Sequence, residues 1–183
     1  MVAFASSLDQ AGPMTLTAED SAIILNQVAG HDIHDATSSR MDCPDFTQDL
    51  DKNIQDLVIG IPEEYFSDDL DPRCAKLIDE AKSVLGKLGV QFKAIHLPNL
   101  KYSVSTYYVI APSEASANLS RFDGVRFGHR CDDPKDLKDL YSRSRSEGFG
   151  AEVQTRILVG TYALSAGYYD AYYRKAQKLR RLI

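Results

Sequence analysis

The first third of the chain contains one stretch of helically spaced apolar residues between two polar segments. Residues 1–16 include a Gly-Pro pair and predict an irregular loop. Thr17 and Asp20 resemble a capping box, and the apolar stripe that follows them predicts a helix ending at Gly30. Residues 31–54 are rich in Asp, Ser and Thr, so we expect a surface loop there.

The next apolar segments predict a βαβ unit. A continuous apolar run over 57–61 is typical of a buried strand. Asp71 as N-cap and Pro72 at the first helical position predict a helix, which Gly89 ends. Alternation over 90–95 predicts a second strand. Two strands joined by a helix are expected to run parallel, since antiparallel neighbours are joined by short hairpins instead.

Helical spacing dominates the rest of the chain. Residues 100–122 predict a helix with many small side chains, which allow a neighbouring element to approach closely. After an Asp-Gly turn, 125–127 predict a short edge strand, and 137–141 predict a short helix. A long helical stretch over 151–183 is expected to break near Ala166-Gly167. Helices combined with the βαβ unit predict an α/β fold.

Composition places the chain among ordinary globular proteins. Its 183 residues are 44% hydrophobic and 26% charged, and the net charge of −5 argues against a general nucleic-acid binder. No apolar run approaches the roughly 20 residues that span a bilayer, and the first residues do not resemble a secretory signal. Cys43, Cys74 and Cys131 are widely spaced, so we expect reduced thiols and a cytoplasmic location.

Two serine patterns contain residue types that can act as nucleophiles, but we assign a catalytic role to neither. Ser6 and Ser7 form a tandem pair, which we interpret as part of a loop that lines a site. Ser83 and Lys87 have the i, i+4 spacing of helix neighbours. A solvated lysine has a pKa too high to act as a base, so we interpret this pair as surface residues.

Charged clusters are interpreted as surface features. His31 and His34 lie with two aspartates in a polar loop that lacks the spacing of a zinc site, so no metal site is predicted. Acidic residues within 63–71 suit a solvated surface and a helix N-terminus. The five cations from Arg174 to Arg181 suit a helix C-terminus, and contact with RNA is a second possibility for them.

Three long blocks of sequence resemble one enzyme family. Residues 2–15, which begin Val-Ala-Phe-Ala-Ser-Ser-Leu-Asp-Gln, resemble the segment that follows the nucleophile region in the amidase signature family. Residues 107–128 and 150–177 resemble, within that family, the A subunits of tRNA-dependent amidotransferases. The resemblance implies an amidase signature fold, in which helices cover a mixed sheet. It also implies that residues 1–183 form a partial amidase domain, truncated at both ends.

The resemblance also implies an activity. In that family a Ser–cis-Ser–Lys triad hydrolyses glutamine to ammonia, and the complex converts Glu-tRNA(Gln) or Asp-tRNA(Asn) to the amidated form. The enzyme class is a carbon–nitrogen ligase with glutamine as amido donor, acting in translation. The expected partners are the B and C subunits of a cytoplasmic heterotrimer, which contacts tRNA. ATP and magnesium serve the assembled complex, and no cofactor is expected in this chain.

The family's site residues transfer to this sequence only in part. The lysine, the Gly/Ser-rich loop and the cis-peptide serine have no counterpart here, so no catalytic residue is assigned and the isolated chain is expected to be inactive. Tyr107 and Arg156 match the tyrosine and arginine that bind glutamine in the family, and the arginine fork suits a carboxylate. Leu16 stands where the family usually has arginine, which puts the geometry of the nearby loop in doubt.

Two other functions fit part of the sequence. A piece of a stand-alone amidase would share the opening block, although the blocks at 107–128 and 150–177 argue against it. A non-catalytic module that binds other subunits would explain the missing triad.

Overall fold

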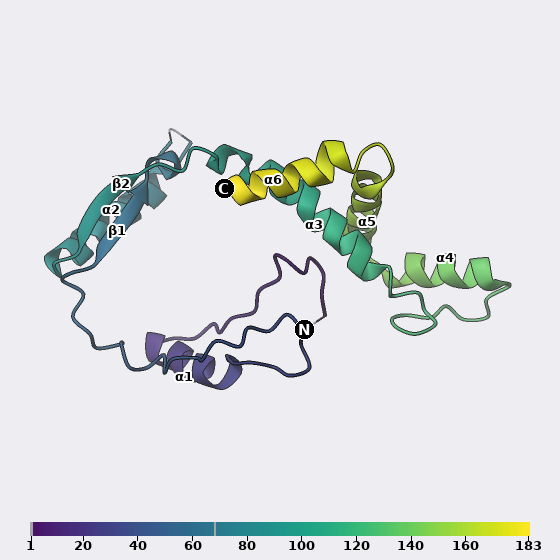
Figure 1. Ribbon diagram of the computed structural model, residues 1–183, viewed down its shortest axis with the longest axis horizontal. Helices are drawn as coiled ribbons and strands as arrows, with labels where there is room; N and C mark the ends of the chain where they lie inside the picture. Colours follow the sequence, from purple (N-terminus) through teal and green to yellow (C-terminus); the bar gives the residue numbers. More distant parts are fainter. Residues whose placement is uncertain (1, 68) are drawn as a thin grey trace. The chain divides into compact units, whose positions relative to one another are not determined.

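The computed structural model describes residues 2–67 and 69–183 (Figure 1). These residues divide into two compact units. One unit contains the residues up to Asp9 together with Leu97–Ile183, and we call it the helical unit. The other contains Gln10–His96, and we call it the βαβ unit. The prediction of a single partial domain over 1–183 stays a prediction.

The first helix of the βαβ unit is the one predicted near the N-terminus. Helix α1 spans Ala18–Val28, and the Thr17 hydroxyl accepts the Asp20 N–H at 3.0 Å, as the capping pattern predicted. The loop that follows is largely exposed and contains turns but no helix or strand among its described residues. The Asn26 side chain ties this loop to α1, since its amide donates to Asp45 and its oxygen accepts the Phe46 N–H.

The predicted strand–helix–strand order is confirmed. Strand β1 (Val58–Pro62) pairs in parallel with β2 (Gln91–Ile95), with Val58 opposite Gln91, and helix α2 (Pro72–Lys87) connects them after a short 3-10 helix, η1 (Glu63–Tyr65) (Figure 1). Asp71 accepts the Arg73 N–H at 2.8 Å as the N-cap of α2. Gly89 adopts a φ of +93° directly after the helix, a conformation that favours glycine.

One expectation about this unit is wrong, because β1 is not buried. Val58 is 60% exposed, and the strand alternates between exposed and half-buried side chains. The reason is that the described residues supply a single neighbouring strand. A continuous apolar run predicts burial only when helices cover both faces of the sheet.

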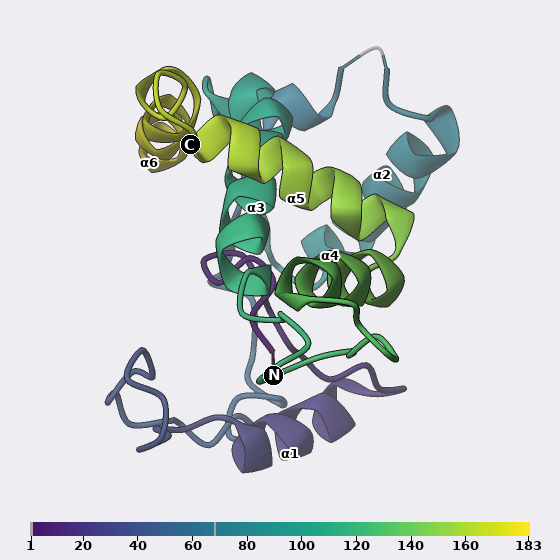
Figure 2. The ribbon, with the colours of Figure 1, turned by 90° about the vertical axis from the view of Figure 1, so that its right-hand side faces the viewer.

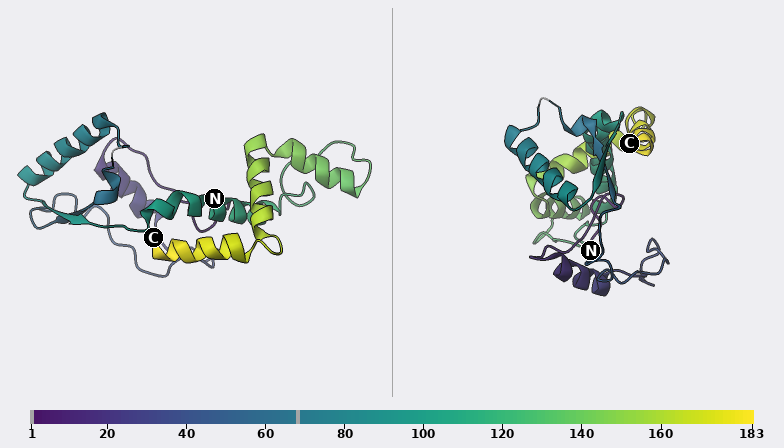
Figure 3. Two further views of the ribbon diagram at one scale, coloured as in Figure 1. Left: turned by 90° about the horizontal axis from the view of Figure 1, so that it is seen from above. Right: turned by 90° about the vertical axis from the view of Figure 1, so that its left-hand side faces the viewer.

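The helical unit is built around one central helix. The short 3-10 helix η2 (Leu100–Tyr102) leads into α3 (Ser103–Leu119), which α5 (Ala151–Leu164) crosses (Figure 2). Helix α6 (Lys175–Leu182) runs beside α3 (Figure 3). The buried core follows α3 and its neighbours, and includes Ile110, Ala111, Ser113, Ala115, Leu119, Leu140, Ala163 and Ala176.

Helix α4 (Leu137–Gly148) lies between α3 and α5 in the sequence and confirms the short helix predicted around 137–141. Arg145 connects it to the end of α3. One guanidinium N–H group donates to the carbonyl oxygens of Leu119 and Phe122, both at 2.9 Å, and the guanidinium lies 5.0 Å from the Phe149 ring centre.

The edge strand predicted at 125–127 is absent from the structure. Asp123 accepts the N–H groups of Val125 and Arg126, and the Gly124 N–H donates to the Phe127 carbonyl. These bonds fold the segment into a tight turn. An aspartate that bonds the backbone two residues onward competes with strand pairing.

The predicted break in the last helix is confirmed. Helix α5 ends at Leu164, Gly167 has a φ of +87°, and a π-helical turn, η3 (Asp170–Arg174), precedes α6. Tyr162 stacks with Tyr168 across this break, with ring centres 4.3 Å apart. Within the described residues, no helix has both the length and the hydrophobicity that a membrane span requires.

Candidate functional site

Helices α3 and α5 approach each other closely at one point. A Cβ atom placed on Gly160 of α5 would lie 1.9 Å from the Pro112 carbonyl oxygen of α3, so only glycine fits there. Next to this contact, the hydroxyls of Ser116 and Thr161 are hydrogen bonded at 2.8 Å. The close neighbour predicted for 100–122 is therefore present, although Pro112 and Ser116 make this contact rather than the small residues from which the neighbour was predicted.

The same two helices bring Tyr107 and Arg156 together. The guanidinium Nε of Arg156 donates to Glu152 at 2.9 Å, one turn earlier on α5. The Tyr107 hydroxyl raises the pKa of Arg156 most, and Glu152 raises that pKa further, because both favour the charged guanidinium. About a quarter of the Arg156 side chain is exposed, as is 43% of Tyr107. A cation beside a hydroxyl, both open to solvent, can bind a carboxylate.

The tandem serines of the opening segment form structural contacts with α3. Glu114 accepts both the N–H and the hydroxyl of Ser7, and Arg180 of α6 donates to the Ser7 hydroxyl. The Asn118 amide donates to the Ser6 hydroxyl at 2.8 Å and to the Phe4 carbonyl at 3.0 Å. Among the described contacts, no lysine reaches either serine. The structure gives both side chains partners that hold the loop in place.

Asp9 fixes the start of the same loop. Its carboxylate accepts the N–H groups of Phe4 and Ala5 at 2.8 and 3.0 Å. Tyr173 of the π-helical turn belongs to the same neighbourhood, because burial raises its pKa first and the Glu114 carboxylate raises it next. The opening segment, α3 and α6 thus share one set of polar contacts.

The remaining sequence candidates lie on exposed surface. Ser83 and Lys87 are both exposed on α2. His31 and His34 are exposed in turns, where Asp32 accepts the His34 N–H at 2.8 Å. Across residues 2–67 and 69–183, no three His, Cys, Asp or Glu side chains lie close enough together to hold a metal ion. The free thiols of Cys43 and Cys74 are exposed, and that of Cys131 is buried.

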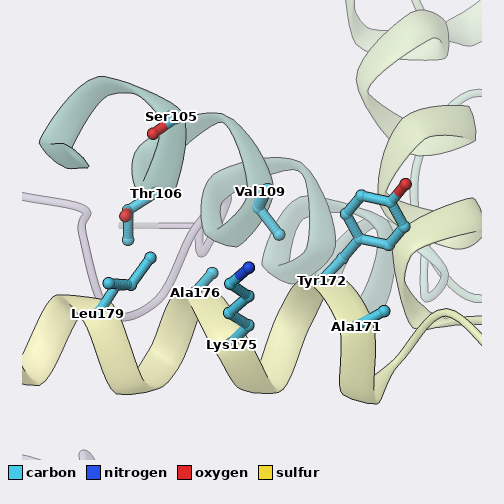
Figure 4. Close-up of a pocket in the computed structure, with 8 residues that line it drawn as sticks. All are labelled: Ser105, Thr106, Val109, Ala171, Tyr172, Lys175, Ala176 and Leu179. Atoms are coloured by element: carbon cyan, nitrogen blue, oxygen red, sulfur yellow. The ribbon is translucent and has the colours of Figure 1, made fainter.

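A separate cavity of about 190 Å³ lies between α3 and the C-terminal helices (Figure 4). It is lined by Ser105, Thr106, Val109, Ala171, Tyr172, Lys175, Ala176 and Leu179. Neither Tyr107 nor Arg156 lines it. The Thr106 hydroxyl is buried without a hydrogen-bond partner among the described residues. Its lining is mainly apolar, and its polar groups are the hydroxyls of Ser105, Thr106 and Tyr172 and the ammonium of Lys175.

Comparison with known proteins identifies the family. A family model described as Amidase matches residues 1–183. The chain belongs to the amidase family. The α/β prediction is confirmed, as a helix-rich chain with a small parallel sheet that corresponds to part of an amidase domain.

Similar proteins carry a more specific description. The glutamyl-tRNA(Gln) amidotransferase subunits A of Pseudomonas savastanoi pv. phaseolicola and Cellvibrio japonicus are each 62% identical to this amidase-family chain over all 183 residues. The chain spans 38% of the length of both relatives. The solved structure of the corresponding subunit from Thermotoga maritima is 38% identical, with a TM-score of 0.68 over 98% of this chain and 34% of that one.

These relatives confirm the resemblance to amidotransferase A subunits. They do not test the assignment of glutamine binding to Tyr107 and Arg156, which stays a prediction. Leu16, the departure from the family pattern, is fully exposed in the βαβ unit, and no described contact explains its effect.

Sequence reasoning assigned no role to the residues that hold the opening segment against α3 or that allow α3 and α5 to approach closely. Glu114 and Asn118 are spaced i, i+4, which places both on one face of α3, and this spacing was a usable signal. Gly160 interrupts a helical pattern, which often marks a packing contact. Arg180 carried no signal, because its partners lie in the opening segment of the chain.

Proposed function

We propose that this chain forms part of the glutamine-binding site of the A subunit of a tRNA-dependent amidotransferase. In this proposal Tyr107 and Arg156 bind the substrate glutamine, and the substrate's α-carboxylate lies against the guanidinium. The observation that carries the proposal is the packing of α3 against α5, which brings the Tyr107 hydroxyl close enough to raise the pKa of Arg156. The 62% identity to subunits of that name supports the enzyme class.

The electrostatics favour an anionic ligand. Arginine stays protonated under all physiological conditions, and its planar fork can donate two parallel hydrogen bonds to one carboxylate. Arg156 uses its Nε for Glu152, whose side chain is 75% exposed. Solvent screens the Arg156–Glu152 ion pair, so this pair contributes little to stability. A substrate carboxylate can therefore replace Glu152 at the guanidinium or bind beside it.

The reaction that this site serves is glutamine hydrolysis. A serine hydroxyl attacks the side-chain amide, ammonia leaves, and water then releases glutamate from the ester. The sequence contains no match for the family's lysine and cis-serine elements, so we expect these 183 residues alone to release no ammonia from glutamine. ATP and magnesium act in the assembled complex with B and C subunits. The acceptor is Glu-tRNA(Gln) or Asp-tRNA(Asn) in the cytoplasm.

A chimera tests this proposal directly. The 183 residues replace the matching segment of the Pseudomonas savastanoi subunit, and glutaminase kinetics are measured in the complex with its partner subunits. We expect an active chimera in which Arg156→Ala raises the KM for glutamine more than tenfold and Tyr107→Phe raises it severalfold. Loss of a charge-assisted carboxylate contact has an effect of this size, because such bonds are worth about 1.5 to 3 kcal/mol.

Arg174→Ala is the matched control. Arg174 also pairs with an acid one turn earlier, Asp170 at 3.0 Å, and lies outside the proposed site. This variant should leave the KM unchanged. An inactive chimera, or an Arg156→Ala chimera with the parental KM, contradicts the proposal. Activity on simple amides with no preference for glutamine would support the stand-alone amidase instead, and assembly without any hydrolysis would support an interaction module.

A further inference from the structure

The closest approach of α3 and α5 lies about one helical turn from the proposed ligand pair. Arg156 precedes Gly160 by four residues on α5, and Tyr107 precedes Pro112 by five residues on α3. Because an α-helix has 3.6 residues per turn, each side chain stands one turn or slightly more from the point of contact. The spacing of the backbones at Gly160 therefore fixes the distance between the two ligand-binding groups.

The contact leaves no room for a side chain. An ideal Cβ on Gly160 would lie 1.9 Å from the Pro112 oxygen and 2.8 Å from the Ser116 Cβ. The nearest obstacle is a backbone oxygen, which no rotamer change can move. Ordinary van der Waals contact needs about 3.5 Å between heavy atoms, so a single methyl group must separate the helices by more than about 1 Å.

We propose that Gly160 is a positioning residue for carboxylate recognition. It allows the backbone contact with Pro112 that holds Arg156 of α5 beside Tyr107 of α3. This inference rests on the proposed function, since it assumes that the pair binds the glutamine carboxylate. A displacement of about 1 Å in a bound substrate can reduce the rate about a hundredfold, so a methyl group at this distant point has a large expected effect.

The test compares two substrates in the active chimera. Glutamine carries the α-carboxylate, and 4-aminobutanamide has the same side-chain amide without it. In Gly160→Ala we expect kcat/KM for glutamine to fall at least tenfold. The value for 4-aminobutanamide should change less than twofold. Damage to the fold would lower both values together, so the ratio of the two separates positioning from stability.

Gly86→Ala is the matched control. Gly86 lies inside helix α2 of the βαβ unit, and a Cβ there meets no atom within 4 Å. This variant should leave both substrates unaffected. If Gly160→Ala fails to fold, as judged by circular dichroism, Ser116→Ala removes the adjacent hydrogen bond to Thr161 without adding volume. It should lower the glutamine preference about two- to threefold.

Each outcome decides one of the two proposals. An unchanged substrate ratio in a folded Gly160→Ala chimera overturns the positioning role, and so does an unchanged ratio in Ser116→Ala if Gly160→Ala cannot fold. The variant Arg156→Lys, measured alongside, tests the proposed function. If it too leaves the ratio unchanged, the carboxylate assignment fails. If only Arg156→Lys lowers the ratio, the assignment stands and the role of Gly160 is lost.

Discussion

The two compact units of this chain use their polar side chains in different ways. In the βαβ unit, aspartates such as Asp35 and Asp71 bond partners two residues away on exposed surface. In the helical unit, Asn118 reaches Phe4 across 114 positions and Glu114 reaches Ser7 across 107. Local bonds shape turns and caps, whereas long-range bonds fix the position of one element against another. The candidate ligand pair lies in the unit whose bonds span the longest separations in sequence.

Core packing should show the largest difference between the units. Ile110 of α3 is 1% exposed, so Ile110→Ala should lower the free energy of unfolding by about 2 to 5 kcal/mol through lost burial and the cavity it leaves. Leu77→Ala on α2, where the side chain is 64% exposed, should cost less than about 1 kcal/mol. Urea unfolding followed by circular dichroism measures both. Equal losses of unfolding free energy in Ile110→Ala and Leu77→Ala would contradict the proposed difference between the two units.

A pair of arginines tests the same contrast with charged groups. Arg145 is half-buried and donates to two carbonyls at the end of α3, so Arg145→Ala should cost about 1.5 to 3 kcal/mol. Arg73 is 90% exposed and bonds Asp71 two residues before it, so Arg73→Ala should lower the free energy of unfolding much less than Arg145→Ala does. Unfolding in high salt sharpens the result, since screening should weaken the Arg73 contact and leave that of Arg145.

Two asparagines each join a helix to a loop, one in each unit. Asn118 is 9% exposed and holds the opening segment, so Asn118→Ala should cost about 1 to 2 kcal/mol. Asn26 holds the loop at Asp45 from a half-buried position, and Asn26→Ala should cost about half as much. Hydrogen exchange over residues 2–9 should also accelerate in Asn118→Ala. Protection of these amides that matches the parent would rule out the anchoring role.

The distinction between local and long-range bonds also explains which features could be predicted from the sequence. The N-caps at Thr17 and Asp71 depend on neighbours within three residues, so local patterns placed both helix starts correctly. The predicted strand at 125–127 failed where a local bond from Asp123 prevailed over β-propensity. The Gly160 contact was predictable only in part. A glycine inside a helix often marks a packing contact, but the partner depends on how α3 crosses α5, and no spacing within one helix encodes a crossing.

The candidate pair shows the same limit. Tyr107 and Arg156 were assigned from resemblance to a family, residue by residue. Nothing in their own surroundings in the sequence indicates that the two side chains meet. Their proximity is a property of the α3–α5 packing, which brings together residues that are far apart in the sequence.

The smallest expected effect concerns pH. The Tyr162 hydroxyl is bonded to Tyr168, and this bond, with desolvation, raises the pKa of Tyr162 to about 12. Because the folded pKa lies above the unfolded value of about 10, the stability from this bond is complete below pH 10 and is lost between pH 10 and 12. Tyr168→Phe should therefore move one tyrosine titration, followed by ultraviolet absorbance, from near 12 toward 10. Tyr65→Phe, in the βαβ unit, should leave the step near 12 in place. If Tyr168→Phe leaves the step near 12 unmoved, the Tyr168 side chain is not what raises the pKa of Tyr162.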